Sequence, residues 1–77
     1  MTIGMDLTNA PFGTPLTLVD IDGAAGNRRR LATLGLREGA AFRLLTRTIG
    51  GGRIVMVGGS RIALSRELVR QLRAHAA

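Results

Sequence analysis

Hydrophobic residues alternate with polar or small residues in several short segments, and this alternation is typical of half-buried β-strands. The pattern predicts four strands, at residues 16–21, 41–48, 54–57 and 62–64. In the first strand we expect Val19 and Ile21 to face inward, with Asp20 between them. Alternation in the second strand places Phe42, Leu44 and Thr46 on one face and Arg43, Leu45 and Arg47 on the other.

Turn residues separate these segments, with a turn at residues 11–15, a glycine hairpin at 49–53 and a tight turn at 58–61. A flexible connection is expected at 22–26, followed by one short helix at 27–34 with Asp22 or Asn27 as its cap. Leu31 and Leu34 are three residues apart, so they would share a helix face. Gly35 then suits the left-handed position just past a helix end, and Leu36 would pack back against the last turn. The helix should therefore end at this glycine, and Gly39 would allow a second tight turn.

The two ends of the chain are expected to differ from the middle. We expect a loose N-terminal segment at residues 1–10, from which Leu7 can dock onto the core. The folded domain should comprise residues 11–73, and a solvated tail should follow at residues 74–77. Leu68, Val69 and Leu72 would line one face of a C-terminal helix, and residues 67–77 look more helical than a closing strand. Consecutive short strands with glycine turns predict a mainly β protein with short helices, folded as a small antiparallel β-barrel.

Composition limits the protein to one small domain of 77 residues without cysteine, which excludes disulfides and thiolate metal sites. No secretory signal opens the sequence, and no apolar run approaches the roughly 20 residues that span a bilayer. We therefore expect a soluble cytoplasmic protein. Its formal net charge is +6, and all eleven basic residues are arginine. Phe12 and Phe42 are the only aromatic residues, which disfavours base stacking on single-stranded nucleic acid.

No group of residues predicts catalysis. Gly50–Gly52 lacks the lysine and the following helix of a phosphate-binding loop. His75 is the only histidine and has no metal-ligating residue at a suitable spacing, and Asp20 with Asp22 gives too few oxygens to enclose a hard cation. Ser60 and Ser65 have no base near them in the sequence. We expect no enzyme activity, no catalytic residue, no cofactor and no metal site.

Two groups of residues are candidates for contact with a partner. Arg28 should lie along the core edge, while Arg29 and Arg30 should be exposed, either simply solvated or in contact with an acidic partner. The second candidate group depends on Val55 and Val57 facing inward. In that case an apolar strip of Leu45, Ile54 and Met56 lies exposed on the outer face of the strands. This strip could bind a partner or a second copy, or it could lie under the C-terminal helix, where Leu68 and Leu72 need something to cover.

The order of several short motifs resembles that of the FeoA family. The motifs are Gly13, Arg30-Leu31, Leu34-Gly35-Leu36, Gly39, Phe42-Arg43-Leu44-Leu45, the glycine hairpin and Gly59-Ser60-Arg61-Ile62-Ala63-Leu64. The resemblance implies an SH3-like barrel and a cytoplasmic accessory protein of bacterial ferrous iron uptake. Its implied partner is FeoB, a membrane transporter with a cytoplasmic G-domain, with homo-oligomers also possible and neither nucleic-acid binding nor membrane insertion expected. The alternatives are a small basic nucleic-acid-binding barrel and a self-associating structural or sensory module.

Overall fold

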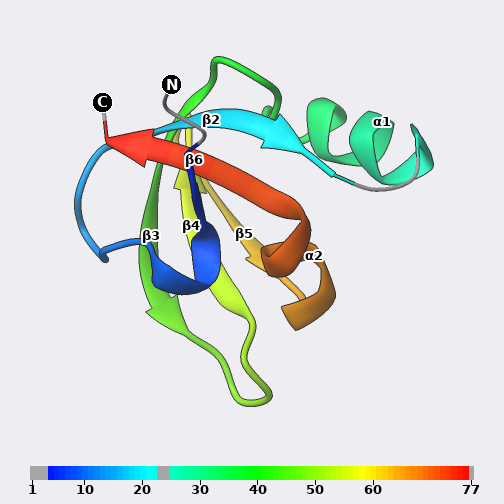
Figure 1. Cartoon of the computed structure of the whole chain (residues 1–77). Helices are drawn as coiled ribbons and strands as arrows, with labels where there is room; N and C mark the ends of the chain where they lie inside the picture. The colour runs from blue at the N-terminus through cyan, green and yellow to red at the C-terminus, as the bar shows by residue number, and fades with distance from the viewer. Residues whose placement is uncertain (1–3, 23–24, 77) are drawn as a thin grey trace.

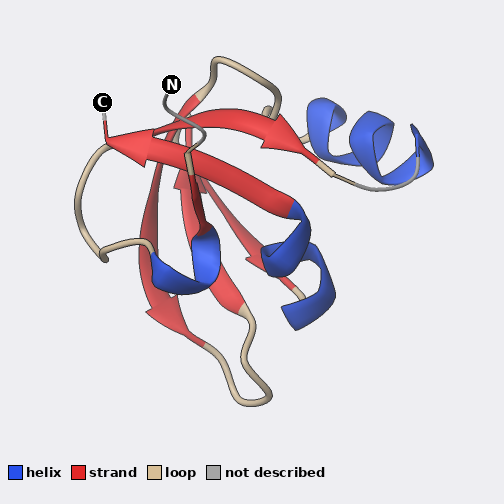
Figure 2. Ribbon diagram, viewed as in Figure 1, coloured by secondary structure: helices blue, strands red, loops and turns tan. Residues whose placement is uncertain are grey.

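Six antiparallel strands form one sheet in the computed structural model, which describes residues 4–22 and 25–76. The elements are β1 (Met5–Asp6), the 3₁₀ helix η1 (Leu7–Asn9), β2 (Leu16–Ile21), α1 (Ala25–Thr33), β3 (Ala41–Arg47), β4 (Arg53–Val57), β5 (Ser60–Leu64), α2 (Arg66–Gln71) and β6 (Leu72–Ala76). The strand order is β1-β6-β2-β3-β4-β5. Figure 1 shows β2 and β6 running across the upper part of β3, β4 and β5, and Figure 2 shows how far strands predominate. The predicted mainly β fold with short helices is therefore confirmed.

One continuous core fills the inside of this curved sheet. Val55 is fully buried and Val57 almost so, which confirms the inward face predicted for β4. The core is built mainly from leucine and other aliphatic side chains: Leu7, Ala10, Leu16, Leu18, Ile21, Leu31, Leu36, Phe42, Leu44, Val55, Val57, Ile62, Leu64, Val69, Leu72 and Ala74. Burial of a Val, Leu, Ile or Phe side chain contributes about 1.5–3 kcal/mol relative to exposure. Most of these side chains come from the inward positions of the strands, and the helices and loops supply the rest.

A shift of register in β2 changes which of its residues face the core. The pairing with β6 slips between Leu18 and Asp20, so Val19 is an extra residue in the strand. Leu18 and Ile21 are buried, whereas Val19 is only half-buried. The prediction that Val19 faces inward with Ile21 is therefore wrong, because a bulge interrupts strict alternation.

A similar shift of register in β3 reverses which residues lie on each face of the sheet at the end of that strand. Leu44 pairs with Val55, but Thr46 then pairs with Ile54 and Arg47 with Arg53, so Leu45 is the extra residue. Residues directly opposite each other in a sheet share a face. Thr46 therefore lies on the outer face and Arg47 on the opposite one, the reverse of the simple alternation predicted for both.

Helix α1 ends as the sequence predicts, although it begins earlier. The N–H of Gly35 donates to Ala32 O (2.9 Å) and the N–H of Leu36 donates to Leu31 O (2.9 Å), which is the Schellman arrangement. Gly35 has φ +95°, and Leu36 is fully buried. Leu34, however, is 47% exposed and does not share the face of Leu31, because the helix has already ended at Thr33.

The residues proposed to cap α1 have other roles. Asn27 lies inside the helix, and its Nδ2 donates to Gln71 Oε1 (3.4 Å). Asp22 lies 3.9 Å from Arg73 through its carboxylate. Residues 23 and 24 of the predicted flexible connection lie outside the described residues, as do residues 1–3 and 77 of the predicted loose ends.

The described parts of both chain ends are built into the sheet. Leu7 is fully buried, as predicted, but Met5 pairs with Ala74 and Asp6 with Arg73, so residues 5–9 are not a loose segment. At the other end α2 stops at Gln71, and β6 pairs with both β1 and β2. The helical continuation expected there is wrong, because pairing with two strands outweighs the local helical pattern. The expected tail is part of β6, with Ala74 buried and His75 and Ala76 exposed. Helix α2 packs against β1, η1, β5 and β6, between the two edge strands.

Candidate protein-interaction surface

The outer strip, defined as Leu45, Ile54 and Met56, lies on the convex side of β3 and β4. Met56 pairs with Arg43 on β3 and with Arg61 on β5, so it lies between two arginines in one row across the sheet. In the next row Ile54 lies between Thr46 and Ala63. The three strands therefore present apolar side chains with a positive charge on either side of Met56.

The strip remains partly accessible to solvent. Leu45 is 37% exposed, and Ile54 and Met56 are half-buried and stand outside the core. The alternative that the C-terminal helix covers the strip is not the observed arrangement. Leu68 packs against the core and Leu72 is buried within it, while α2 lies against β1, η1, β5 and β6.

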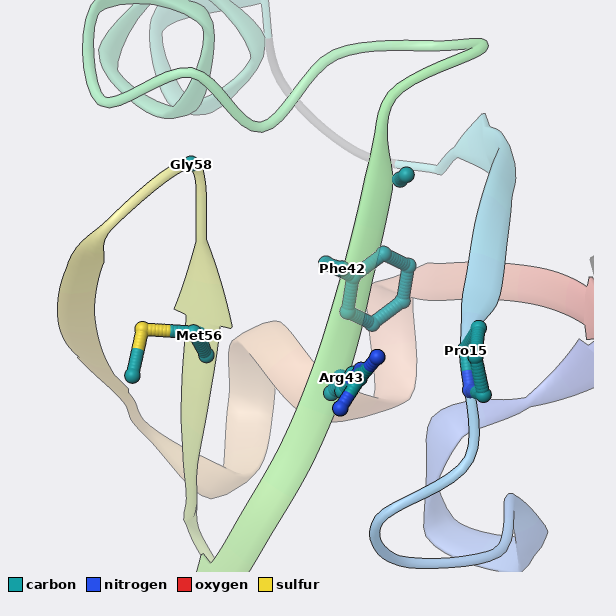
Figure 3. A pocket seen from close by; sticks show the side chains of 6 residues that line it. Pro15, Phe42, Arg43, Met56 and Gly58 are labelled. Atoms are coloured by element: carbon teal, nitrogen blue, oxygen red, sulfur yellow. The ribbon is translucent and has the colours of Figure 1, made fainter.

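A hollow of about 230 Å³ adjoins the Met56 end of the strip. Figure 3 shows Met56 on β4 and Arg43 on β3, with Pro15, just before β2, on the other side of β3 from Met56. Buried Phe42 and the turn residue Gly58 complete its lining together with Ala41. Small-molecule pockets usually enclose about 300–1,000 Å³. This hollow is smaller and better suited to one side chain of a protein partner.

The charged residues of this face are the two arginines that flank Met56, Arg43 and Arg61, and the surrounding sequence supplies no acid. Residues 39–66 contain five arginines and no acidic residue. The ion pairs in the described part of the chain lie elsewhere, joining Arg28 to Asp20 (4.0 Å) and Glu38 (3.4 Å), and Arg73 to Asp22 (3.9 Å). Arg43 and Arg61 thus carry charge that no carboxylate of the described residues neutralises. An acidic partner surface would be attracted to them.

Arg29 and Arg30 are exposed, as predicted, but they lie on α1 and not beside the outer strip. Figure 1 shows α1 beyond the end of β2, apart from the strands that carry the strip. Neighbouring Arg28 is held in place, because its Nη2 donates to Ile21 O (2.6 Å). The structure therefore surrounds Met56 with arginines that the sequence did not single out, Arg43 and Arg61. Only the register of the three strands reveals them.

The other candidates for chemistry occupy structural positions. Ser65 Oγ accepts a hydrogen bond from the N–H of Leu68 (3.3 Å), and His75 lies on β6 with its Nδ1 3.0 Å from Ala76 O. The predicted glycine hairpin is confirmed, with the N–H of Thr48 donating to Gly52 O (3.1 Å). Within residues 4–22 and 25–76, no three histidine or acidic side chains gather as metal ligands. None of the described helices is long and apolar enough to cross a membrane.

Comparison with known proteins identifies the family. The model of the FeoA domain matches residues 5–75. A crystal structure described as an iron uptake regulatory protein (FeoA) is 26% identical, with 99% of this chain and 100% of that chain covered and a TM-score of 0.82. FeoA from Chlorobium tepidum is 25% identical over 94% of this chain and 70% of that chain, with a TM-score of 0.84.

A third structure adds a description of the fold. It is the zinc complex of FeoA from Stenotrophomonas maltophilia, 28% identical over 92% of this chain and 89% of that chain, with a TM-score of 0.71. That protein is described as a prokaryotic SH3 domain protein and a candidate activating factor of ferrous iron transport. No curated protein matches the chain. The predicted resemblance and the SH3-like fold are thus confirmed, and the chain belongs to the FeoA domain family, which is associated with ferrous iron transport.

Proposed function

We propose that the chain is a non-enzymatic, cytoplasmic accessory protein of ferrous iron uptake, and that it acts by contact with the cytoplasmic part of a FeoB-type transporter. The description of the Stenotrophomonas maltophilia relative as a candidate transport-activating factor supports this role. An accessory protein of this kind needs a recognition surface and no catalytic residues.

The observation that carries the proposal is the position of Met56. It is an accessible apolar side chain, lies between Arg43 and Arg61, and adjoins a hollow of about 230 Å³. Protein interfaces combine an apolar centre with charged residues at the rim, and both methionine and arginine are enriched in them. We place the transporter contact on the outer strip and its two flanking arginines, with Arg29 and Arg30 on α1 as a second, separate candidate contact.

The test is binding of the purified chain to detergent-solubilised FeoB from the source cells, with nuclease added and at physiological salt. Met56→Asp places a carboxylate between Arg43 and Arg61, where it neutralises the positive face and removes the apolar centre. We expect this variant to bind about 10-fold more weakly or worse. Ile49→Asp is the matched control, because Ile49 is fully exposed at the hairpin and lies outside the strip.

The outcomes separate the alternatives. Equal binding by Met56→Asp and Ile49→Asp would remove the strip from the interface, and an Arg29→Ala/Arg30→Ala variant would then test α1. If the unmodified chain captures no transporter, and binding to cell extract appears only without nuclease, the protein is a nucleic-acid-binding barrel instead, with a steep dependence of affinity on salt. If the unmodified chain binds neither the transporter nor nucleic acid, but its apparent molecular mass in solution rises with protein concentration, the protein is a self-associating module.

A further inference from the structure

A second positive site lies next to the β3–β4 hairpin, where an aromatic ring meets two arginines. This hairpin corner consists of Phe12, Leu45, Thr46, Arg47 and Arg53. The guanidinium carbons of Arg47 and Arg53 each lie 5.6 Å from the centre of the Phe12 ring. Both distances are within the range of a cation–π interaction. Phe12, in the turn before β2, thus contacts both the end of β3 and the start of β4.

The bulge at Leu45 creates this arrangement. Without the bulge Arg47 would face away from Arg53, but the shifted register pairs the two residues directly across the strands. Like charges directly opposite each other destabilise a sheet. Phe12 is held beside them because the N–H of the next residue, Gly13, donates to Leu44 O (2.8 Å). The corner therefore holds two positive charges that repel each other. The cation–π contacts with the Phe12 ring offset this repulsion only in part.

Arg53 is buried without a carboxylate partner. It is 5% exposed, and its hydrogen bonds all go to neutral backbone carbonyls, from Nη1 to Gly51 O (3.1 Å) and Gly52 O (3.0 Å) and from Nη2 to Thr8 O (3.4 Å). Its Nε is buried without an acceptor among the described residues. A buried charge is costly unless it is paired. The positive charge is thus held in a region of low dielectric constant, where it attracts an anion strongly.

The charge is not balanced by neighbouring acids. Asp6 is the acidic residue nearest in sequence to the Thr8 carbonyl, and its Oδ1 accepts from both the N–H and the Oγ1 of Thr8 (3.0 Å each). Among the described residues, neither Arg47 nor Arg53 forms an ion pair. An incoming carboxylate would therefore meet the unneutralised guanidinium of exposed Arg47, with the charge of buried Arg53 behind it.

The corner also offers an apolar floor. A hollow of about 310 Å³ is lined by Phe12, Leu45, Thr46 and Arg47. Phe12 is 38% exposed, and Leu45 contributes its exposed side chain from the bulge. A free inorganic anion would use only the positive edge of this hollow. A ligand with a carboxylate beside an apolar side chain would use both the edge and the floor.

We propose that the hairpin corner binds an acidic peptide segment of a protein partner, in which a glutamate or aspartate lies next to a large apolar residue. Arg47, on the lining of the hollow, donates hydrogen bonds to the carboxylate, and buried Arg53 strengthens the attraction from beneath. The apolar residue of the peptide covers Phe12 and Leu45. The corner shares Leu45 with the outer strip, but peptide binding depends on Arg47 and Phe12 whereas the transporter contact depends on Met56, so the Arg47→Gln and Met56→Asp variants test the two proposals separately.

The test uses two capped peptides and the ¹⁵N-labelled full-length chain at fixed salt. The acidic peptide is acetyl-Leu-Glu-Phe-Glu-amide, and its neutral counterpart replaces both glutamates by glutamine. We expect the acidic peptide alone to shift the Arg47 Nε–Hε signal and the Thr46 amide signal in a saturable way. Arg47→Gln should weaken its binding by about 5-fold or more, as expected for loss of a charge-assisted hydrogen bond. Arg37→Gln, the same change at an exposed residue outside the corner, should leave binding unchanged.

Three results would overturn the proposal. The first is equal shifts with the acidic and the neutral peptide, which would show apolar contact without charge recognition. The second is equal weakening by Arg47→Gln and Arg37→Gln, which would indicate attraction to the net charge of the whole protein. The third is inorganic phosphate at the same concentration producing the same shifts and displacing the peptide, which would make the corner a simple anion site.

Discussion

Gly52 lies where the hairpin comes closest to the end of β5. A Cβ at this position would overlap the carbonyl oxygen of Leu64 and would lie 2.6 Å from Thr48 Oγ1. The Leu64 oxygen belongs to the backbone and has little freedom to move. Only a residue without a side chain allows β4 to begin against this strand, and the next residue along is the buried Arg53 of the hairpin corner.

Gly52→Ala should therefore lower the free energy of unfolding by about 2–3 kcal/mol, because overpacking against the backbone forces the hairpin away from β5. Urea unfolding followed by circular dichroism measures this difference. Gly26→Ala is the control, since Gly26 lies within α1 with no atom near the added methyl group. It should raise stability by about 0.5–1 kcal/mol. A similar free energy of unfolding for the two variants would contradict the close approach of Gly52 to the backbone of β5.

The structural role of a residue could be predicted from the sequence where it depends on near neighbours in the chain, but not where it depends on residues far away in the chain. Gly35 and Leu36 could be assigned because a Schellman end depends on neighbours within six residues. The burial of Arg53 could not, because its acceptor on Thr8 is 45 residues away in the sequence. Arg47 was placed on the wrong face because no residue type announces the bulge at Leu45.

Helix α2 is short, and its start depends on one side chain. Ser65 has extended backbone angles (φ −70°, ψ 162°), and its Oγ accepts from the N–H of Leu68. Glu67 in the first turn adds a favourable charge at the N-terminal end. Because α2 lies between the edge strands β1 and β5, this cap stabilises more than the helix itself.

Ser65→Ala should lower the stability by about 1 kcal/mol, because the N–H of Leu68 loses its acceptor. For a domain of this size, that change corresponds to a fall in Tm of about 4–8 °C. Differential scanning calorimetry measures it. Ser60→Ala serves for comparison, since Ser60 is exposed at the start of β5 and its side chain makes no hydrogen bond among the described residues. An equal fall in Tm for both variants would show that the Ser65 cap is not responsible.

Among the elements, the four strands with clear alternation were predicted to within two residues. The strand β1 was expected to be part of a loose segment, and β6 was expected to be helical. Its residues, Leu72–Ala76, include two alanines and follow a helix without any turn signal. They form a strand because β1 and β2 offer unpaired backbone on both sides. Tertiary pairing of this kind leaves no mark in a short sequence window.

At the scale of the whole molecule, β6 is an inner strand of the sheet that joins the edge strand β1 to β2. Leu72 and Ala74 are fully buried in it. A chain that stops after Gln71 should lose its cooperative unfolding transition, since β1, β2 and α2 would all lose packing partners at once. Loss of signal dispersion in the ¹H–¹⁵N spectrum would show this.

The comparison for this truncation is a change on the exposed side of the same strand. His75→Thr keeps the backbone pairing with Thr17 and should leave the unfolding transition close to that of the unmodified chain. A truncated chain that still unfolds cooperatively would mean that the remaining five strands are stable alone. In that case β6 would be an addition to the barrel and not part of its core.

At the same scale, the sequence indicated an apolar strip and a basic surface but not how they combine. Ile54 and Met56 were predicted to point outward, and the pairing of β4 agrees. Arg29 and Arg30 are neighbours in the sequence, whereas Arg43 and Arg61 are brought to either side of Met56 only by the pairing of β3, β4 and β5. Which of these surfaces meets a partner remains a prediction for the binding experiments above.

The position of β6 also sets the order in which the protein can acquire its structure during translation. The ribosome makes residues 72–76 after the other five strands, yet these residues lie between β1 and β2. Domains generally fold as units while chains grow at about 5–20 residues per second. Until β6 is made, the backbone groups of β1 and β2 that pair with it in the folded protein have no strand partner. Slow translation of β6 would prolong exposure of those backbone groups to chaperones and to other nascent chains.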